Sequence, residues 1–137
     1  GDGPLRDDLL NRIKQHGLEN SIHLLGYRSD IAQLLRASDG YVSSSAWEGL
    51  PMVLLEAAAA GLPIVATDVQ GNRDIVDGRG VLVTRGDAEA LAGAMIALQS
   101  VSSEGRRRVA ELLREKVAME FDIDSVTSRW IQLYEQA

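Results

Sequence analysis

The sequence lacks cysteine altogether, and it holds only three prolines and one phenylalanine among its 137 residues. Without cysteine, a disulfide framework and a thiolate metal site are both excluded, and the composition fits a reducing compartment. No apolar run reaches the roughly 20 residues that a membrane-spanning helix needs. The remaining classes are those of a protein that folds around an ordinary hydrophobic core.

Positive charge is scarce as well, because 14 Lys and Arg stand against 20 Asp and Glu, which gives a net charge of −6. A protein that holds a nucleic-acid backbone needs clustered cations, so we expect no nucleic-acid partner. The hydrophobic fraction of 45% and the charged fraction of 25% are typical of a globular chain rather than a disordered one. At this length the chain forms one domain or most of one.

Short apolar runs alternate along the chain with segments of helical periodicity. The runs are continuously apolar, which is typical of buried strands in a parallel α/β sheet covered by helices on both faces. Gly17 and Gly61 are predicted to end the first and the central helix. Val126, Trp130 and Leu133 are expected to face inward from the last one. We expect strands at residues 22–25, 40–43, 63–67 and 80–83, and helices over about 4–16, 31–35, 51–60, 88–98, 104–118 and 124–134, with a single helical turn at 73–76.

In such a sheet, ligands bind beyond the carboxyl ends of the strands. The loops expected at that edge are residues 26–28, 44–49 and 68–72, together with the first three residues. The chain opens on a turn from Gly1 to Pro4 with no strand before it. We therefore expect that one or more strands precede residue 1.

Glu56 is the only charge in the apolar run from Met52 to Gly61. A helix that is apolar on all sides is usually buried, and a buried carboxylate needs a partner. We therefore expect Glu56 to accept hydrogen bonds from a polar ligand, since two vicinal hydroxyls of a ribose match the two oxygens of one carboxylate. The alternative is that Glu56 lies on a narrow exposed stripe of the helix without a ligand.

Glu48 precedes Gly49, Leu50 and Pro51, where the central helix is expected to begin. A helix N-terminus offers free N–H groups and the positive end of its dipole, and a glycine lets a ligand approach the backbone closely. A phosphate at this N-terminus and a ribose at Glu56 would fit one nucleotide, with Glu48 beyond the phosphates. The alternative is that Glu48 is a solvated loop residue that interacts only with the helix dipole.

Five segments, in order, resemble the group 1 glycosyltransferases, family 4 of the retaining enzymes with the GT-B fold. Glu48 to Glu56 matches their E-x7-E motif, which alone would be a weak signal. Residues 1–5 resemble the loop after the family's second C-domain strand, 22–26 its V-x-F-L-G strand, 37–45 its A-D-x-x-V-x-P-S segment, 48–67 its E-G-x-P and E-A-x-A-x-G-x-P-V-V-A-T segment, and 69–76 its V-G-G-N-R-E-I-V segment. The order of all five makes the resemblance specific.

The resemblance implies that residues 1–137 form a Rossmann-like, nucleotide-sugar-binding C-terminal domain, part of a two-domain enzyme and without its first strand or strands. Glu48 would be the catalytic residue, in contact with the donor sugar near the reacting centre. The other residues implied in binding are Gly49 and Leu50 at the diphosphate or sugar, Glu56 at the ribose, Tyr27 and Arg28 at the base, and the loop glycines Gly3 and Gly71.

The resemblance further implies a UDP- or GDP-sugar donor, with no metal and no cofactor. The acceptor would be a glycan, a lipid-linked sugar or a small molecule, held by an N-terminal domain outside this chain, and the family's phosphate-binding Arg and Lys would precede residue 1. We expect hexosyl transfer with retention in glycan or polysaccharide biosynthesis. The location would be the cytoplasm or the inner face of the membrane, with peripheral membrane contact by the full-length protein. The 137-residue chain alone is expected to be inactive.

Three positions depart from the family pattern: Ser44 replaces a proline, Gln70 the first of two loop glycines, and Asp74 a glutamate. Two rival functions remain at this stage. One is a catalytically silent nucleotide-sugar module, and the other is hydrolysis, because glycosidases also use paired carboxylates. The serines at 43–45 lack a neighbouring base, so a serine nucleophile is not expected.

Overall fold

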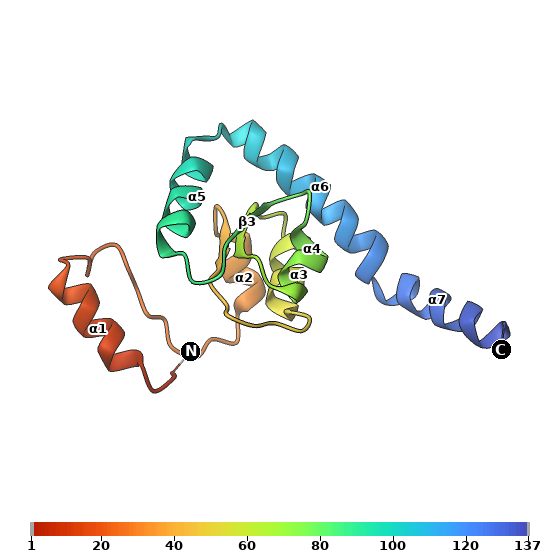
Figure 1. Ribbon diagram of the computed structural model, residues 1–137, viewed down its shortest axis with the longest axis horizontal. Helices are drawn as coiled ribbons and strands as arrows, with labels where there is room; N and C mark the ends of the chain where they lie inside the picture. Colours follow the sequence, from red (N-terminus) through yellow and green to blue (C-terminus); the bar gives the residue numbers. More distant parts are fainter. Residues whose placement is uncertain (1, 137) are drawn as a thin grey trace. The chain divides into compact units, whose positions relative to one another are not determined.

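The computed structural model describes residues 2–136, so the predicted opening turn at Gly1 begins outside the described residues. The described chain divides into two compact units, one ending at Ile31 and the other beginning at Ala32. The elements, labelled in Figure 1, are α1 (Arg6–Gln15), α2 (Ile31–Arg36), β1 (Tyr41–Ser43), α3 (Met52–Ala59), β2 (Ile64–Thr67), α4 (Gln70–Val76), β3 (Val81–Val83), α5 (Ala88–Ser100), α6 (Ser103–Phe121) and α7 (Ile123–Glu135).

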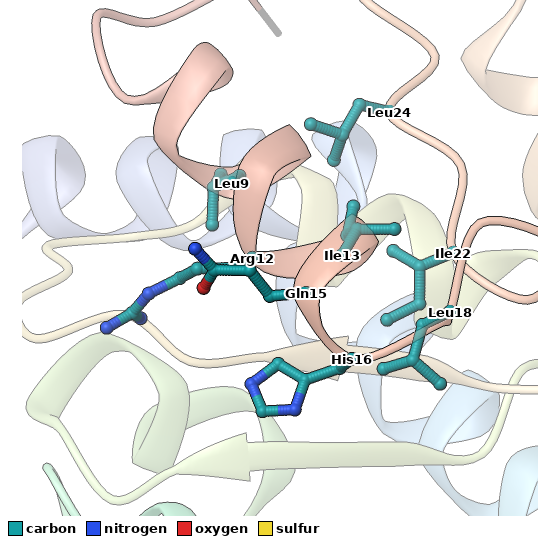
Figure 2. Close-up of a pocket in the computed structure, with 8 residues that line it drawn as sticks. All are labelled: Leu9, Arg12, Ile13, Gln15, His16, Leu18, Ile22 and Leu24. Atoms are coloured by element: carbon teal, nitrogen blue, oxygen red, sulfur yellow. The ribbon is translucent and has the colours of Figure 1, made fainter.

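The first unit is built on α1, which ends where the sequence predicts. Gly17 has φ +63°, a left-handed conformation that glycine adopts without strain. The N–H of Leu18 donates to the Ile13 carbonyl at 3.0 Å and that of Gly17 to the Lys14 carbonyl at 3.1 Å, the paired bonds of a Schellman cap. Figure 2 shows the pocket of about 570 Å³ beside this cap, where Ile13, Leu18 and Ile22 lie near one another.

The strand predicted at residues 22–25 is wrong. The backbone there forms no ladder in the described structure, and Ile22 and Leu25 are 44% and 57% exposed. The described sheet consists of β1, β2 and β3, so no described strand pairs with this run. Apolar residues favour a strand only where a neighbouring edge satisfies the backbone N–H and C=O groups, and sequence periodicity carries no information about that edge.

The second unit contains a parallel sheet in the order β1-β2-β3, as the continuous apolar runs predict. Val42 pairs in register with Val65, and Val65 with Val81. The central strand β2 is buried along its whole length. Ile64 and Ala66 share one core with side chains of α3, α4 and α6, whereas α5 packs on β2 and β3 and lies on the other side of the sheet (Figure 1).

The local signals for helix ends hold in this unit too. Gly61 ends α3 with φ +75°, and the N–H of Leu62 donates to the Ala57 carbonyl at 3.1 Å. The Asp87 side chain caps α5 by accepting the Ala90 N–H at 2.8 Å. The single turn predicted at 73–76 is the second half of the longer helix α4.

The inward face predicted for α7 is wrong at Trp130 and Leu133, which are 55% and 59% exposed, whereas Val126 is half-buried. Its main described neighbour is α6, which precedes it directly in the chain. Apolar spacing predicts an amphipathic helix correctly here, but it does not show what covers the apolar face. No helix within residues 2–136 has both the length and the hydropathy of a membrane span.

Candidate functional site

The loop from Ser44 to Pro51 connects the carboxyl end of β1 to the first turn of α3. Pro51 is the N-cap residue of α3, and no side-chain hydrogen bond caps the helix N-terminus there among the described residues. Gly49 and Leu50, just before it, are exposed, and Glu48 is half-buried. The sheet edge therefore presents an accessible helix N-terminus beside a carboxylate, as the sequence predicts.

Two hydrogen bonds join this loop to the ends of two strands, and a third holds Glu48 within the loop. The Ser45 hydroxyl donates to Oε1 of Glu48 at 2.7 Å, and the Ser43 hydroxyl, at the end of β1, donates to the Ser45 hydroxyl at 3.4 Å. The Thr67 hydroxyl, at the end of β2, donates to the Ser45 carbonyl at 2.5 Å. The position of Glu48 is thus set by both strands.

Gly71 packs directly on the backbone of the same loop. Its N–H donates to the Glu48 carbonyl at 3.3 Å. A Cβ at this position would lie 2.8 Å from the Gly49 carbonyl carbon and 2.9 Å from the Glu48 carbonyl oxygen, closer than real Cβ atoms come to other heavy atoms. Only glycine lets α4 approach this closely, so Gly71 has a packing role. Its contact with a ligand stays a prediction.

Asn72 joins the end of β2 to the first turn of α4. The side chain is fully buried, and its Nδ2 donates to the Thr67 carbonyl at 2.9 Å and to the Thr67 hydroxyl oxygen at 3.4 Å. Its Oδ1 has no hydrogen-bond partner among the described residues. Sequence reasoning missed Ser45, Thr67 and Asn72 as site residues. The available signal was a polar side chain at the end of a buried strand and just beyond it.

Glu56 is exposed, so the expectation that it is buried is wrong. The buried side of α3 carries Leu54, Ala57 and Ala58, whereas Met52 and Glu56 lie on its open side. An apolar helix of small residues buries only the side that packs on the core. The structure therefore shows the exposed stripe that was the alternative, and a ribose at Glu56 rests on the family motif rather than on burial.

The open side of α3 and the neighbouring face of α6 line a pocket of about 360 Å³. Its charged side chains are Glu56, Arg114 and Asp122, and its apolar ones include Met52 and Phe121.

Tyr41 connects the two glutamates electrostatically. Partial burial raises the pKa of the Tyr41 phenol first, and the negative charges of Glu48 and Glu56 raise this pKa further. Both carboxylates therefore lie within electrostatic range of one hydroxyl at the start of β1. Glu48, Gly49 and Leu50 precede α3, Gly71 packs on their backbone, and Glu56 lies within α3 itself, so all five belong to the second unit.

The predicted base-binding residues belong to the first unit. Tyr27 is exposed, and its N–H donates to Asp2 at 3.0 Å. Arg28 forms a two-point ion pair with Asp30, with Nε–Oδ1 and Nη2–Oδ2 distances of 2.7 and 2.5 Å, which raises the pKa of Arg28 and lowers that of Asp30. The Gly3 carbonyl accepts the Arg6 N–H at the start of α1. Ligand binding by these three residues stays a prediction.

No cluster of three or more His, Asp or Glu side chains within residues 2–136 could hold a metal ion. Metal independence remains an expectation from the resemblance.

A family model described as "Glycosyl transferases group 1" matches residues 1–100. The chain is 37% identical over 99 residues to the UDP-Gal:alpha-D-GlcNAc-diphosphoundecaprenol alpha-1,3-galactosyltransferase of Escherichia coli, covering 70% of this chain and 26% of that protein. It is 34% identical over 135 residues to the lipopolysaccharide core biosynthesis glycosyltransferase LpsE of Rhizobium meliloti, covering 97% of this chain and 39% of that protein. The chain thus spans well under half of either relative.

Solved structures agree with the sequence relatives. Anabaena Alr3699/HepE in complex with UDP superposes with a TM-score of 0.87 at 27% identity, over 96% of this chain and 36% of that one. Sucrose-phosphate synthase from Thermosynechococcus elongatus gives 0.85 at 27% identity, over 99% of this chain and 35% of that one. The structural neighbours are glycosyltransferases of the GT-B fold. The parallel sheet, the E-x7-E pair and these matches agree that the chain belongs to the group 1 glycosyltransferases.

Proposed function

We propose that residues 1–137 are the donor-binding domain of a retaining glycosyltransferase that transfers a hexosyl group from a UDP- or GDP-sugar to an acceptor hydroxyl. The observation that carries the proposal is a carboxylate, Glu48, held beside the accessible N-terminus of α3 at the carboxyl edge of a parallel sheet. The E. coli relative is named for a UDP-galactose donor, and Anabaena HepE has been crystallised with UDP-glucose, which supports a nucleotide-sugar donor here.

In this proposal the N-terminus of α3 binds the donor diphosphate. Negative charge develops on the leaving diphosphate as the glycosidic bond breaks, and the backbone N–H groups and the helix dipole stabilise that charge. A Cβ at Gly49 would meet no atom within 4 Å, so on that side the diphosphate can reach the backbone near Leu50. Glu56, one turn further along α3, holds the ribose hydroxyls from the open side of the helix.

Glu48 lies beside the donor sugar and stabilises the positive charge that develops at its anomeric carbon in an oxocarbenium-like transition state. The acceptor oxygen bonds to the anomeric carbon on the face from which the diphosphate leaves, and the acceptor proton passes to the leaving diphosphate, so the anomeric configuration is retained. Neither step uses a metal or a cofactor. Tyr27 and Arg28 contact the base, and Gly3 and Gly71 line the donor loops.

The whole enzyme, in this proposal, binds its acceptor through an N-terminal domain and contributes further basic groups to the diphosphate from sequence outside this chain. The acceptor is a glycan, a lipid-linked sugar or a small molecule in glycan or polysaccharide biosynthesis. The enzyme acts in the cytoplasm, with peripheral contact at the inner face of the membrane where the acceptor is lipid-linked. No nucleic acid is a partner, in keeping with the net charge of −6.

The direct test is calorimetric titration of the full-length protein with UDP, GDP and free hexoses, followed by a transfer assay with the nucleotide sugar that binds. We expect a nucleoside diphosphate to bind and free hexoses to give no heat. Binding of free hexoses without nucleoside diphosphates would instead indicate a glycosidase. The 137-residue chain alone should give no transfer, and sugar transfer by that chain would contradict the two-domain assignment.

A further inference from the structure

We propose that Ser45 is a positioning residue for sugar transfer: its hydroxyl holds the Glu48 carboxylate in one orientation, and Thr67 and Asn72 hold Ser45. This inference rests on the proposed role of Glu48 at the reacting centre. It adds Ser45, Thr67 and Asn72 to the site, and the E-x7-E motif contains none of these three residues.

The contact between Ser45 and Glu48 is short and charge-assisted. The Ser45 hydroxyl donates to Oε1 of Glu48 at 2.7 Å, and both side chains are half-buried. A glutamate on a loop otherwise samples several rotamers, and a hydrogen bond to one oxygen selects among them. Because Oε1 is engaged by Ser45, Oε2 is the oxygen left to face the donor sugar.

Thr67 connects the loop that carries Ser45 to a rigid part of the fold. It is the last residue of the fully buried strand β2, and its hydroxyl donates to the Ser45 carbonyl at 2.5 Å. This hydrogen bond joins the central strand to the loop from Ser44 to Pro51, and the two residues are 22 positions apart in the sequence. Side chains held by strands are placed more accurately than side chains held by loops alone. The central strand of the sheet therefore fixes the position of the loop.

Asn72 fixes the direction of the hydrogen bonds. The Thr67 hydroxyl gives its single hydrogen to Ser45, so its oxygen acts only as an acceptor toward Nδ2 of Asn72 at 3.4 Å. Nδ2 also donates to the Thr67 carbonyl at 2.9 Å. The hydrogen bonds thus link buried Asn72 through Thr67 to the Ser45 backbone, while the Ser45 hydroxyl points its hydrogen at Glu48.

The first experiment compares Ser45→Ala with Ser45→Thr in the full-length enzyme. We expect Ser45→Ala to lower kcat by about 10- to 100-fold, the effect of losing one hydrogen bond to a charged group. The affinity for UDP should stay within about 2-fold, because the nucleotide contacts are elsewhere, and Ser45→Thr should restore most of kcat. The matched control is Ser100→Ala on α5, where the Ser100 hydroxyl donates to the Ile96 carbonyl of the same helix, and this variant should leave kcat unchanged.

The second experiment repeats Ser45→Ala in a Glu48→Asp enzyme, whose shorter carboxylate no longer reaches the Ser45 hydroxyl. If Ser45 acts through Glu48, Ser45→Ala should lower the kcat of this enzyme by less than about 2-fold, which is the signature of coupled residues. An equal loss of kcat in both backgrounds, or parallel losses of kcat and UDP affinity, would overturn the positioning role and indicate a structural one.

A third comparison tests whether the Thr67 hydroxyl on β2 holds Ser45 in place. Thr67→Val removes the hydroxyl at nearly constant volume, and Thr67→Ser keeps it. We expect Thr67→Val to lower kcat by about 3- to 10-fold, since its effect is indirect, and Thr67→Ser to stay near wild type. Equal activity of the two variants would remove Thr67 from the proposal. Failure of the proposed function itself has a different signature, namely unchanged turnover in Glu48→Ala.

Discussion

The two glutamates of the E-x7-E pair lie in contrasting surroundings. Glu48 accepts a side-chain hydrogen bond within a loop that both β1 and β2 fix, and Gly71 packs against its backbone. Glu56 lies on the open side of α3, where no hydrogen bond or ion pair among the described residues engages its carboxylate. The protein itself therefore determines where Glu48 points, whereas a bound ligand must determine where Glu56 points.

The sharpest test of this contrast is the pair Glu48→Ala and Glu56→Ala in the full-length enzyme. Loss of a group that stabilises the transition state costs on the order of 10²- to 10³-fold in kcat, and we expect this for Glu48→Ala. The affinity for UDP should change little. Steady-state kinetics and UDP titration of the same preparations separate the two quantities. Unchanged turnover in Glu48→Ala would favour a catalytically silent module.

The next largest effect is expected from Gly71→Ala, because the loop that carries Glu48 packs directly on Gly71. Gly71→Ala should lower the free energy of unfolding by about 1–3 kcal/mol, because the added methyl group overlaps the Glu48–Gly49 backbone. Thermal unfolding of the folded domain measures this. The matched control is Gly93→Ala in the middle of α5, where nothing lies within 4 Å and alanine should stabilise by about 0.5–1 kcal/mol. Equal Tm values for the two variants would show that the loop is free to move away from α4.

Glu56→Ala should have a smaller and different effect. The side chain is exposed, so its removal should leave the Tm unchanged. Loss of hydrogen bonds to the ribose should weaken UDP binding by about 10-fold. Glu89→Ala, which removes another exposed helical glutamate from α5, is the control for UDP binding. A lower Tm with intact UDP binding would reverse the contrast and make Glu56 structural.

The smallest effect concerns Tyr41, which both carboxylates influence. Its pKa is raised in the folded state, so the stability that this proton contributes is present below the unfolded-state pKa of about 10 and is lost as the pH rises through the folded-state pKa. Glu48→Gln and Glu56→Gln should each lower the pKa of Tyr41, while burial keeps it raised. Alkaline absorbance titration, with Tyr41→Phe subtracted, measures this pKa. A value that neither variant changes would place the carboxylates too far away to interact with the hydroxyl.

Local signals in the sequence predict much of this structure. Helix ends at Gly17 and Gly61 and the cap at Asp87 depend on the conformation and hydrogen bonding of a few neighbouring residues. The three strands of the sheet follow from their short apolar runs, although only β2 is buried along its whole length and β1 and β3 are partly exposed. The loop that contains Glu48 follows from the same pattern, since it connects a strand to a helix beginning at Pro51.

Features that depend on distant partners were not predicted. The run at 22–25 has strand composition but no described neighbouring strand. Glu56 and the apolar face of α7 are exposed because burial depends on what packs against a helix, which helical periodicity does not specify. The hydrogen bonds from Thr67 to Ser45 and from Asn72 to Thr67 depend on how the strand ends and loops come together in the fold, so spacing in the sequence gives no direct sign of them.

The proposed binding site for the donor nucleotide is the N-terminus of α3, between Glu48 and Glu56. A crystal structure of the full-length protein with UDP tests it most directly. We expect the ribose hydroxyls within hydrogen-bond distance of Glu56 and the diphosphate at the backbone of Gly49 and Leu50. A nucleotide bound away from this helix N-terminus, with Glu56 still facing solvent, would contradict it.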